Sequence, residues 1–449
     1  MRRDHNSIRV NRQSVIMYID TNSFFASCEQ QLRPELRGRP VGVCTYDSPN
    51  ACVIAPSVEA KRYGVKTGMR FSECKALCPD IVPVTARPVE YRRFHIAIME
   101  VLRHYCPEVM AKSIDEAALN LTSYKLVYKD VMELGRQIKA DIAKATELLS
   151  GQDGHFVKCS IGIAPNTFLA KLATEIQKPD GLVRITPDNI DEHLSHMKLT
   201  DLPGIARSNA NRLQMIGINS PLEMRKASQM MLRKAFGGIV GHYWYSRLNF
   251  GEVDLYSRDY RAMSAGRTVS PQQRSSFGSL DALLISLCTK LEQRLVKQRV
   301  FCRQASFSIR YQNGTSWDTR VRFPSPLQDA MELRQYIMHN MKVFEESHRV
   351  GAMLSNQVKH MVVVVMDFLR DSYVQYSLFD DRSKKDNLRR VMYAIKDRYG
   401  KYKIRKGSEL MMRSEMKDAI GFGSVKDLYS AGDMNGHDLN RYLLEEMDE

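Results

Sequence analysis

The spacing of apolar positions predicts an α/β region up to about residue 184. Val15 to Ile19 is a continuous apolar run that ends at Asp20, as in a strand covered on both faces. Segments with helical spacing alternate with further short apolar runs, and elements that alternate in this way return to one sheet. Residues 35–85 are rich in Gly and Pro, which indicates a small insertion. Helices are expected at 22–31, 91–105, 128–148 and 166–177, and strands at 109–114, 117–121 and 157–163.

Beyond this region the pattern changes twice. Residues 185–250 lack strand signals and predict an all-helical segment, and the polar stretch 252–261 predicts a linker. A second α/β region follows in the order β-α-β-β-α-β, a split-βαβ unit with a strong turn signal at Asn313-Gly314. After Asp371 the pattern predicts no further domain. In this unit strands are expected at 263–270, 302–312, 316–323 and 360–368, and helices at 280–298 and 327–347.

Length and charge narrow the possible partners. The chain has 449 residues, too many for one core, and 66 Lys and Arg against 51 Asp and Glu give a net charge of +15. This balance favours a polyanion, and nucleic acid over a membrane, because no basic amphipathic stretch adjoins a hydrophobic anchor. A basic protein with merely solvated lysines is the alternative. No apolar run or N-terminal pattern indicates a membrane span or a signal peptide, so a soluble, cytoplasmic protein is expected.

Cysteine and histidine usage gives no support to a zinc site. The nine cysteines form no repeated C-x-x-C pair, which favours reduced and mostly buried thiols. The 11 histidines include no H-E-x-x-H motif, so a hydrolytic zinc centre is not expected.

Three carboxylates stand at the ends of predicted strands. Asp20 ends the first buried run, and Asp115-Glu116 separates two strand segments. A carboxylate in such a place is costly unless it is paired or binds a metal, and Mg²⁺ is the ion that suits three oxygen ligands at one point. Two such ions would activate a 3′-hydroxyl and stabilise a leaving pyrophosphate. The alternative is that Asp20 caps the next helix and Asp115-Glu116 is a solvated turn.

The segments around these carboxylates resemble the Y-family, or translesion, DNA polymerases. The matching segments occur in the same order and spacing as in the family. The resemblance extends over about 15–380, and it favours the UmuC type (the polymerase V catalytic subunit) over the DinB (polymerase IV) branch. Asn22, the run Ala26-Ser27-Cys28-Glu29 and Glu59-Ala60-Lys61 suggest that choice. The segments are Ile19–Glu29, Ser57–Lys61, Ser113–Ala117, Gly162–Ala164, Ala170–Ala173 and Lys178–Gly181.

The resemblance implies a right-hand polymerase of mixed α/β (α+β) class. Its parts would be a catalytic palm, small fingers, a helical thumb and a C-terminal β-α-β-β-α-β domain, the little finger. The expected boundaries are a flexible N-terminus at 1–14, the palm at 15–30 and 85–184, the fingers at 31–84, the thumb at 185–251, a linker at 252–261, the little finger at 262–371 and a tail at 372–449.

The resemblance also implies a metal site. Asp20, Asp115 and Glu116 would bind two Mg²⁺ ions, and the carbonyl of Thr21 would complete the ligand set.

Nucleotide-contacting residues follow from the same match. Phe25 falls at the steric gate, a ring that would clash with a ribonucleotide 2′-hydroxyl. Without the family, a plain core phenylalanine is the simpler interpretation. Lys61 and Lys178 fall at triphosphate-contacting positions, where an ammonium supplies a point charge to phosphate oxygens. Lys178, beside a Pro-Asp-Gly turn, would otherwise be a surface lysine.

Four positions depart from the family pattern. Val58 replaces a frequent tyrosine, Lys61 an arginine and Thr167 a lysine, and Ala118 stands where an aromatic residue is usual. None is an expected metal ligand, so the departures bear on nucleotide affinity and on speed.

Two further regions are expected to contact DNA. Gly204 and Ile205, in Leu-Pro-Gly-Ile, resemble a helix-hairpin-helix turn whose backbone N–H groups approach a phosphate, although Pro-Gly is also an ordinary turn. In the second α/β unit, Arg310, Arg320 and Arg322 alternate with apolar residues and would form a basic sheet face along DNA. A merely solvated face is the alternative.

The tail contains a candidate peptide for protein binding. Gln375, Leu378 and Phe379, in Gln-Tyr-Ser-Leu-Phe, resemble a bacterial peptide that binds the sliding clamp, with two apolar anchors for a groove. The UmuC resemblance further implies a processed UmuD-like accessory dimer, a recombinase filament and nucleoid association.

The sequence therefore predicts a template-directed translesion DNA polymerase that acts in DNA repair and the SOS response. Its partners would be primer-template DNA, deoxynucleotide triphosphates and the clamp. The alternatives are a catalytically weak polymerase-like protein that scaffolds a lesion-bypass complex, and a metal-dependent nuclease.

Overall fold

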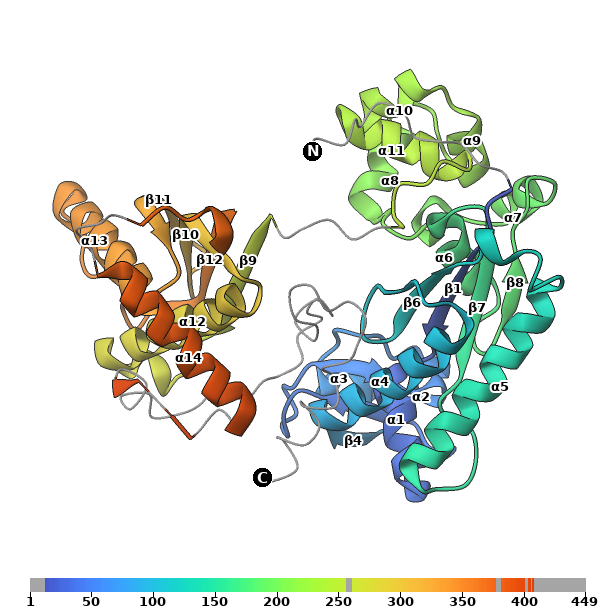
Figure 1. The fold of residues 1–449 in the computed structure, drawn as a ribbon, viewed down its shortest axis with the longest axis horizontal. Helices are drawn as coiled ribbons and strands as arrows, with labels where there is room; N and C mark the ends of the chain where they lie inside the picture. The colour runs from blue at the N-terminus through green and yellow to red at the C-terminus, as the bar shows by residue number, and fades with distance from the viewer. Residues whose placement is uncertain (1–12, 256–260, 377–380, 400–402, 405, 408–449) are drawn as a thin grey trace. The chain divides into compact units, whose positions relative to one another are not determined.

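A computed structural model of the chain describes residues 13–255, 261–376, 381–399, 403–404 and 406–407 (Figure 1). These residues form two compact units that divide between 255 and 261. Within the described ranges, no helix has the length and apolar character that a membrane span needs.

The first unit contains a five-stranded sheet that corresponds to the expected palm. Its central strand β1 (Ile16–Thr21) is buried along its whole length, as the continuous apolar run predicts. Both neighbours of β1 are antiparallel to it, and the register pairs Asp20 with Glu116. The strand order is β5 (Val109–Ala111), β6 (Glu116–Asn120), β1, β7 (Cys159–Ala164) and β8 (Leu182–Arg184).

Helices cover both faces of this sheet. Met17 and Ile19 belong to the core formed with α1 (Phe24–Leu32), α4 (Pro88–Tyr105) and α5 (Val131–Ser150). Ile16 and Tyr18 belong to the core on the other side, formed with α6 (Thr167–Ile176) and the helices that follow it. Because side chains alternate along a strand, Asp20 shares the face of Tyr18 and is directed toward α6.

The insertion between α1 and α4 has its own small sheet. Loops rich in Gly and Pro connect its three strands, which lie in the order β3, β2, β4 across the sheet. Ser57 begins a short helix, since its side chain accepts a hydrogen bond from the N–H of Ala60. The elements are β2 (Val41–Cys44), β3 (Val53–Pro56), α2 (Val58–Arg62), α3 (Phe71–Leu77) and β4 (Val82–Thr85).

The all-helical prediction for the next segment is correct. Its helices pack around the buried Trp244. They are α7 (Ile190–Ser195), α8 (Arg207–Gln214), α9 (Pro221–Lys226), α10 (Gln229–Phe236) and α11 (Ile239–Leu248). Short 3-10 helices lie at Pro34–Leu36, Thr122–Tyr124, Leu199–Asp201, Gln273–Ser275 and Asp371–Tyr373.

The second unit has the predicted β-α-β-β-α-β order. Its four strands form one antiparallel sheet in the order β11, β10, β12, β9. Phe307 and Ile309 are fully buried against the helices, as their alternation predicts. The elements are β9 (Ala262–Thr268), α12 (Phe277–Lys297), β10 (Val300–Tyr311), β11 (Ser316–Leu327), α13 (Ala330–His348) and β12 (Val358–Arg370).

Sequence reasoning missed one helix of this unit, α14 (Arg382–Tyr399), in the predicted tail. It packs against α12, where Tyr393 donates a hydrogen bond to the buried Glu292. The helix was missed because charged residues make up part of its buried face. Arg389 is only 6% exposed, and it contacts Asp329 and Asp386.

Candidate active site

The backbone brings the three predicted metal ligands to one edge of the palm sheet. Asp20, near the end of β1, faces Glu116, the first residue of β6. Asp115 immediately precedes Glu116, and its carbonyl accepts a hydrogen bond from the N–H of Thr21 at 2.9 Å. The residue before α1 is Ser23, so Asp20 does not cap that helix as the alternative proposed.

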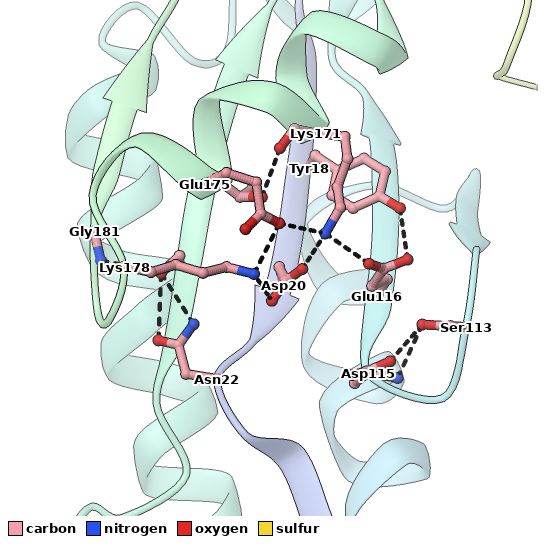
Figure 2. A network of polar contacts seen from close by, with 12 residues as sticks. Tyr18, Asp20, Asn22, Ser113, Asp115, Glu116, Lys171, Glu175, Lys178 and Gly181 are labelled. Carbon is pink, nitrogen blue, oxygen red and sulfur yellow. Dashed lines mark hydrogen bonds and ion pairs between the residues drawn. The ribbon is translucent and has the colours of Figure 1, made fainter. Parts of the chain in front are cut away.

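Two lysines from α6 and the loop after it neutralise part of this charge (Figure 2). The Lys171 ammonium lies 2.7 Å from Glu116 Oε1 and 3.0 Å from Glu175 Oε1, and it also pairs with Asp20 Oδ2. Lys178 contacts the other oxygen of Asp20 at 3.0 Å and Glu175 at 2.9 Å. The sequence predicted Lys178 as a triphosphate contact. It assigned no role to Lys171, although this lysine lies in Ala-Lys-Leu-Ala, one of the matching segments.

Tyr18 adds a hydrogen bond to the same edge. Its hydroxyl donates to Glu116 Oε2 at 2.9 Å, and the Lys171 ammonium lies 5.5 Å from its ring centroid. Ala118, where the family usually has an aromatic residue, pairs with Tyr18 in the register. Since directly paired residues share a face of the sheet, Tyr18 supplies an aromatic ring beside this position.

The carboxylates differ in their electrostatic surroundings. Burial pushes the pKa of Glu116 upward, but the Lys171 ammonium and the hydrogen bonds outweigh it, and the pKa of Glu116 is lowered. For Asp115, burial and the charges of Glu116 and Asp20 raise the pKa, against an opposing hydrogen bond from Ser113. The Ser113 hydroxyl donates to Asp115 Oδ1 at 2.5 Å, and Figure 2 shows this carboxylate beside Ser113 and apart from Lys171.

The donor set fits hard divalent cations in its chemistry. Within the described ranges, no three His, Cys, Asp or Glu side chains form a ready metal-binding group. The oxygens of Asp20 and Glu116 instead face Lys171, so an ammonium holds atoms that Mg²⁺ would take. Three carboxylates at one sheet edge nevertheless supply the oxygen ligands that Mg²⁺ prefers, and their charge already attracts two cationic side chains.

Asn22, the residue after β1, holds the loop that carries Lys178. The Asn22 side chain accepts a hydrogen bond from the N–H of Asp180 at 2.7 Å and donates to Ser160 Oγ at 3.1 Å. Ser160 Oγ also accepts from the N–H of Gly181 at 3.2 Å, and a Cβ at Gly181 would lie 1.9 Å from the carbonyl oxygen of Gln177. Asn22, which suggested the UmuC branch in the sequence, therefore has a local structural function.

The other predicted nucleotide contacts lie on two different helices. Lys61 is exposed on α2, and desolvation followed by the charge of Lys178 lowers its pKa, so the two ammonium groups interact. Phe25 lies on α1 within the palm core, and its ring stacks on that of Tyr91 at a centroid distance of 4.5 Å. The structure thus places Phe25 in the core, and its function as a steric gate stays a prediction.

Thr167, which stands where a lysine is common in the family, has a structural function in this chain. Its N–H and its hydroxyl both donate to Glu252 Oε2, each at 2.8 Å, and the residue is buried. The neighbouring Asn166 donates to the carbonyls of Arg247 and Gly251, at 2.9 and 3.0 Å. These bonds, which we call the α6 clasp, fasten the start of α6 to the end of α11 and the segment after it.

The residues predicted to contact DNA lie in a glycine turn of the first unit and on one sheet face of the second. Gly204 has φ +92° in the turn before α8, while Ile205 is buried. Arg310, Arg320 and Arg322 are exposed on the sheet face opposite the helical core. A second glycine turn, at 237–238 between α10 and α11, also has positive φ, and sequence reasoning missed it.

Part of the candidate clamp peptide lies outside the described residues. Gln375 is exposed just after the last strand. Leu378 and Phe379 fall within 377–380, which the structure does not describe.

Comparisons with known proteins agree on one family. A model of the impB/mucB/samB family matches residues 19–175, and a model of that family's C-terminal domain matches 261–378. Together they match more than half of the chain. Among solved structures, a Y-family DNA polymerase chimera of Dbh and Dpo4 has a TM-score of 0.65 at 20% identity, over 79% of this chain and 99% of that chain. At this identity the likeness shows the fold alone.

The curated relatives correct the expected branch. DNA polymerase IV of Pelotomaculum thermopropionicum is 27% identical over 90% of this chain and 98% of its own length. DNA polymerase IV 1 of Bacillus subtilis is 27% identical over 93% of this chain and 98% of its own. The preference for the UmuC type was therefore wrong, because it rested on a few local residues such as Asn22, whereas similarity along the chain supports the DinB type. The chain belongs to the impB/mucB/samB family, the Y-family DNA polymerases.

Proposed function

We propose that this chain is a template-directed translesion DNA polymerase that extends primer 3′ ends with deoxynucleotides by two-metal nucleotidyl transfer. The observation that carries the proposal is the meeting of Asp20, Asp115 and Glu116 at one sheet edge, with Lys171 and Lys178 beside them.

Asp20, Asp115 and Glu116, with the carbonyl of Thr21, would hold two Mg²⁺ ions. Bound there, such ions lower the pKa of a primer 3′-hydroxyl and neutralise charge on the departing pyrophosphate. Lys171 competes for oxygens of Asp20 and Glu116, so its ammonium must yield part of this contact to a metal ligand set.

The nucleotide would be positioned by charge and by shape. Lys61 and Lys178 supply point charges to triphosphate oxygens from α2 and from the loop after α6. Phe25 packs against the deoxyribose and excludes a 2′-hydroxyl. Arg310, Arg320 and Arg322 bind template and primer phosphates without reading the sequence.

The proposal extends to a sliding clamp, bound by the peptide of Gln375, Leu378 and Phe379, and to cytoplasmic work on damaged DNA. The UmuD-like dimer, the recombinase filament and the SOS role were expected through the UmuC branch, and the correction to the DinB type removes that support.

Primer extension on an intact template and on one with an abasic site tests the proposal. Wild type should extend both primers with Mg²⁺, and Asp115→Ala/Glu116→Ala should extend neither. The matched control is Asp191→Ala/Glu192→Ala, an adjacent Asp-Glu pair on α7 that should retain extension. Failure of wild type to extend, even with clamp, would favour the accessory-scaffold alternative. Metal-dependent loss of the primer would instead favour a nuclease.

A further inference from the structure

The ring of Phe25 has a buried aromatic neighbour whose position is itself tightly held. Tyr91, on α4, stacks on Phe25 with a centroid distance of 4.5 Å and an interplanar angle of 19°. Tyr91 has no solvent exposure, and Phe25 is 7% exposed. One face of the Phe25 ring is therefore covered by a second ring, in a stacked arrangement that aromatic pairs favour.

The hydroxyl of Tyr91 is bound to a carboxylate inside the palm. It donates a hydrogen bond to Glu29 Oε1 at 2.8 Å. Glu29 is fully buried, and the guanidinium of Arg87 binds both of its oxygens, at 3.0 and 2.6 Å. A buried charge with a two-pronged arginine partner has little freedom to shift, since any movement breaks charge-assisted hydrogen bonds.

These contacts form a continuous chain from Arg87 through Glu29 and Tyr91 to Phe25. Packed interiors transmit displacement because they contain little empty space. Phe25 can retreat from a bulkier sugar only if the Tyr91 ring also moves, and the Tyr91 ring can move only by losing its bond to Glu29.

We propose that Tyr91, anchored by Glu29, is a specificity-determining positioning residue that supports Phe25 from behind and sets how strictly the polymerase excludes ribonucleotides. The inference rests on the proposed function, in which Phe25 faces the sugar. Phe25 supplies the clash with the 2′-hydroxyl, and Tyr91 prevents the ring from giving way.

The test measures the ratio of kcat/KM for dATP to that for ATP opposite a template thymine. Tyr91→Leu removes the stack and the tether and should lower the ratio about tenfold. Tyr91→Phe keeps the stack but loses the tether, and Glu29→Gln weakens the anchor, so each should lower the ratio about threefold. Both substrates are measured on one preparation, so the ratio does not depend on the folded fraction.

The same helix provides a matched control in Tyr105. This residue is also buried, its hydroxyl bonds Asp141, and its ring packs on Tyr128. Tyr105→Leu and Tyr105→Phe should leave the ratio at the wild-type value. Phe25→Ala should lower it more than any Tyr91 variant, on the order of 100-fold.

The outcomes separate the two claims. If Phe25→Ala leaves the ratio unchanged, Phe25 is not a gate, and both that part of the proposed function and this inference are overturned. If Phe25→Ala lowers the ratio but the Tyr91 and Glu29 variants match the Tyr105 controls, only the support by Tyr91 is overturned. Should Tyr91→Leu not fold, Tyr91→Phe and Glu29→Gln still decide the question.

Discussion

Two groups of carboxylates, one in each unit, differ in how their oxygens are bonded. In the second unit, both carboxylate oxygens of Glu292 on α12 accept hydrogen bonds. It accepts hydrogen bonds from Tyr393 at 2.9 Å, from the N–H of Ala330 at 2.7 Å and from Lys406 at 2.6 and 2.7 Å. Arg389 lies 3.6 Å away and also binds Asp329 and Asp386, so three carboxylates share two cationic side chains.

The carboxylates at the edge of the palm sheet have fewer partners. Asp20, Glu116 and Glu175 share the ammonium groups of Lys171 and Lys178, and Asp115 has Ser113 as its side-chain partner. Four carboxylates therefore meet two ammonium groups, and negative charge remains in excess.

Negative charge is in excess in both groups, but each oxygen of Glu292 has two donors, whereas each oxygen of Asp20 has one lysine partner. The difference teaches that the number of donors on each oxygen, more than net charge, separates a structural carboxylate from a candidate catalytic one. An acid whose two oxygens each accept from two donors inside the protein has no capacity left for a ligand. An edge with surplus negative charge is costly for the fold alone and becomes favourable when a cation binds.

The largest expected effect is on catalysis. Asp20→Asn should lower kcat/KM for primer extension at least about 1000-fold, or about 4 kcal/mol, by removing a metal ligand. The free energy of unfolding should change by less than about 1 kcal/mol, because Lys171 keeps Glu116 and Glu175. Extension assays and urea unfolding measure the two quantities. Extension within tenfold of wild type would remove Asp20 from the ligand set.

Glu292→Ala should show the reverse pattern. It removes the fully buried carboxylate that bonds Lys406, Tyr393 and the N–H of Ala330 and leaves Arg389 with Asp329 and Asp386, so the free energy of unfolding of the second unit should fall by about 3 kcal/mol. Tyr393→Phe, which removes one hydrogen bond, should cost about 1 kcal/mol. Urea unfolding measures both losses, and a Glu292→Ala loss below that of Tyr393→Phe would contradict the comparison.

A smaller effect concerns pH and the palm core. Burial, helped by the charge of Arg103, lowers the pKa of His95 to about 4, although a hydrogen bond with the carbonyl of Ile114 opposes the shift. The unfolded chain, with a histidine pKa near 6.5, then binds more protons than the folded chain between pH 6.5 and 4. The contribution of the neutral, buried His95 to the free energy of unfolding is therefore fully present above pH 6.5 and is lost as the pH falls toward 4.

This contribution should amount to about 2 kcal/mol between pH 8 and pH 5. His95→Gln should lack that part of the pH dependence in urea unfolding, while wild type shows it. Parallel pH profiles for the two proteins would mean that His95 is not the neutral buried group described here.

The smallest expected effect tests the basic face of the second unit. Arg320→Ala/Arg322→Ala should reduce the slope of log affinity against log salt for duplex DNA by about two, because each arginine neutralises about one phosphate. Lys342→Ala/Arg349→Ala, on and just after α13, should leave the slope unchanged. Equal slopes in all three proteins would restore the interpretation of a merely solvated face.

Regular periodicity made most of the fold predictable. The continuous apolar run of β1 and the alternation at Phe307 and Ile309 each reflect burial of one kind of surface, which a sequence records directly. Helix α14 could not be found in this way. Its buried face includes Asp386 and Arg389, which are buried only because Asp329 and Glu292 lie opposite them.

The candidate site was predictable where strand ends carry carboxylates, since a sheet brings strand ends together. Asp20, Asp115 and Glu116 meet for that reason. The partners that set their charge balance, Lys171 above all, depend on how α6 lies across the sheet. Glu252, which bonds Thr167, lies 85 residues further along the chain, and no local pattern connects the two.

The α6 clasp gives this helix a mechanical function. Thr167, at one end, is bonded to Glu252, and Glu175, at the other end, contacts Lys171 and Lys178. Eight residues of helix separate the two points, a rigid arm of about 12 Å. A displacement of Glu252 would tilt this arm and displace the ammonium groups at the carboxylate edge. The helix thus acts as a lever that connects the position of Glu252 to the charges around Asp20.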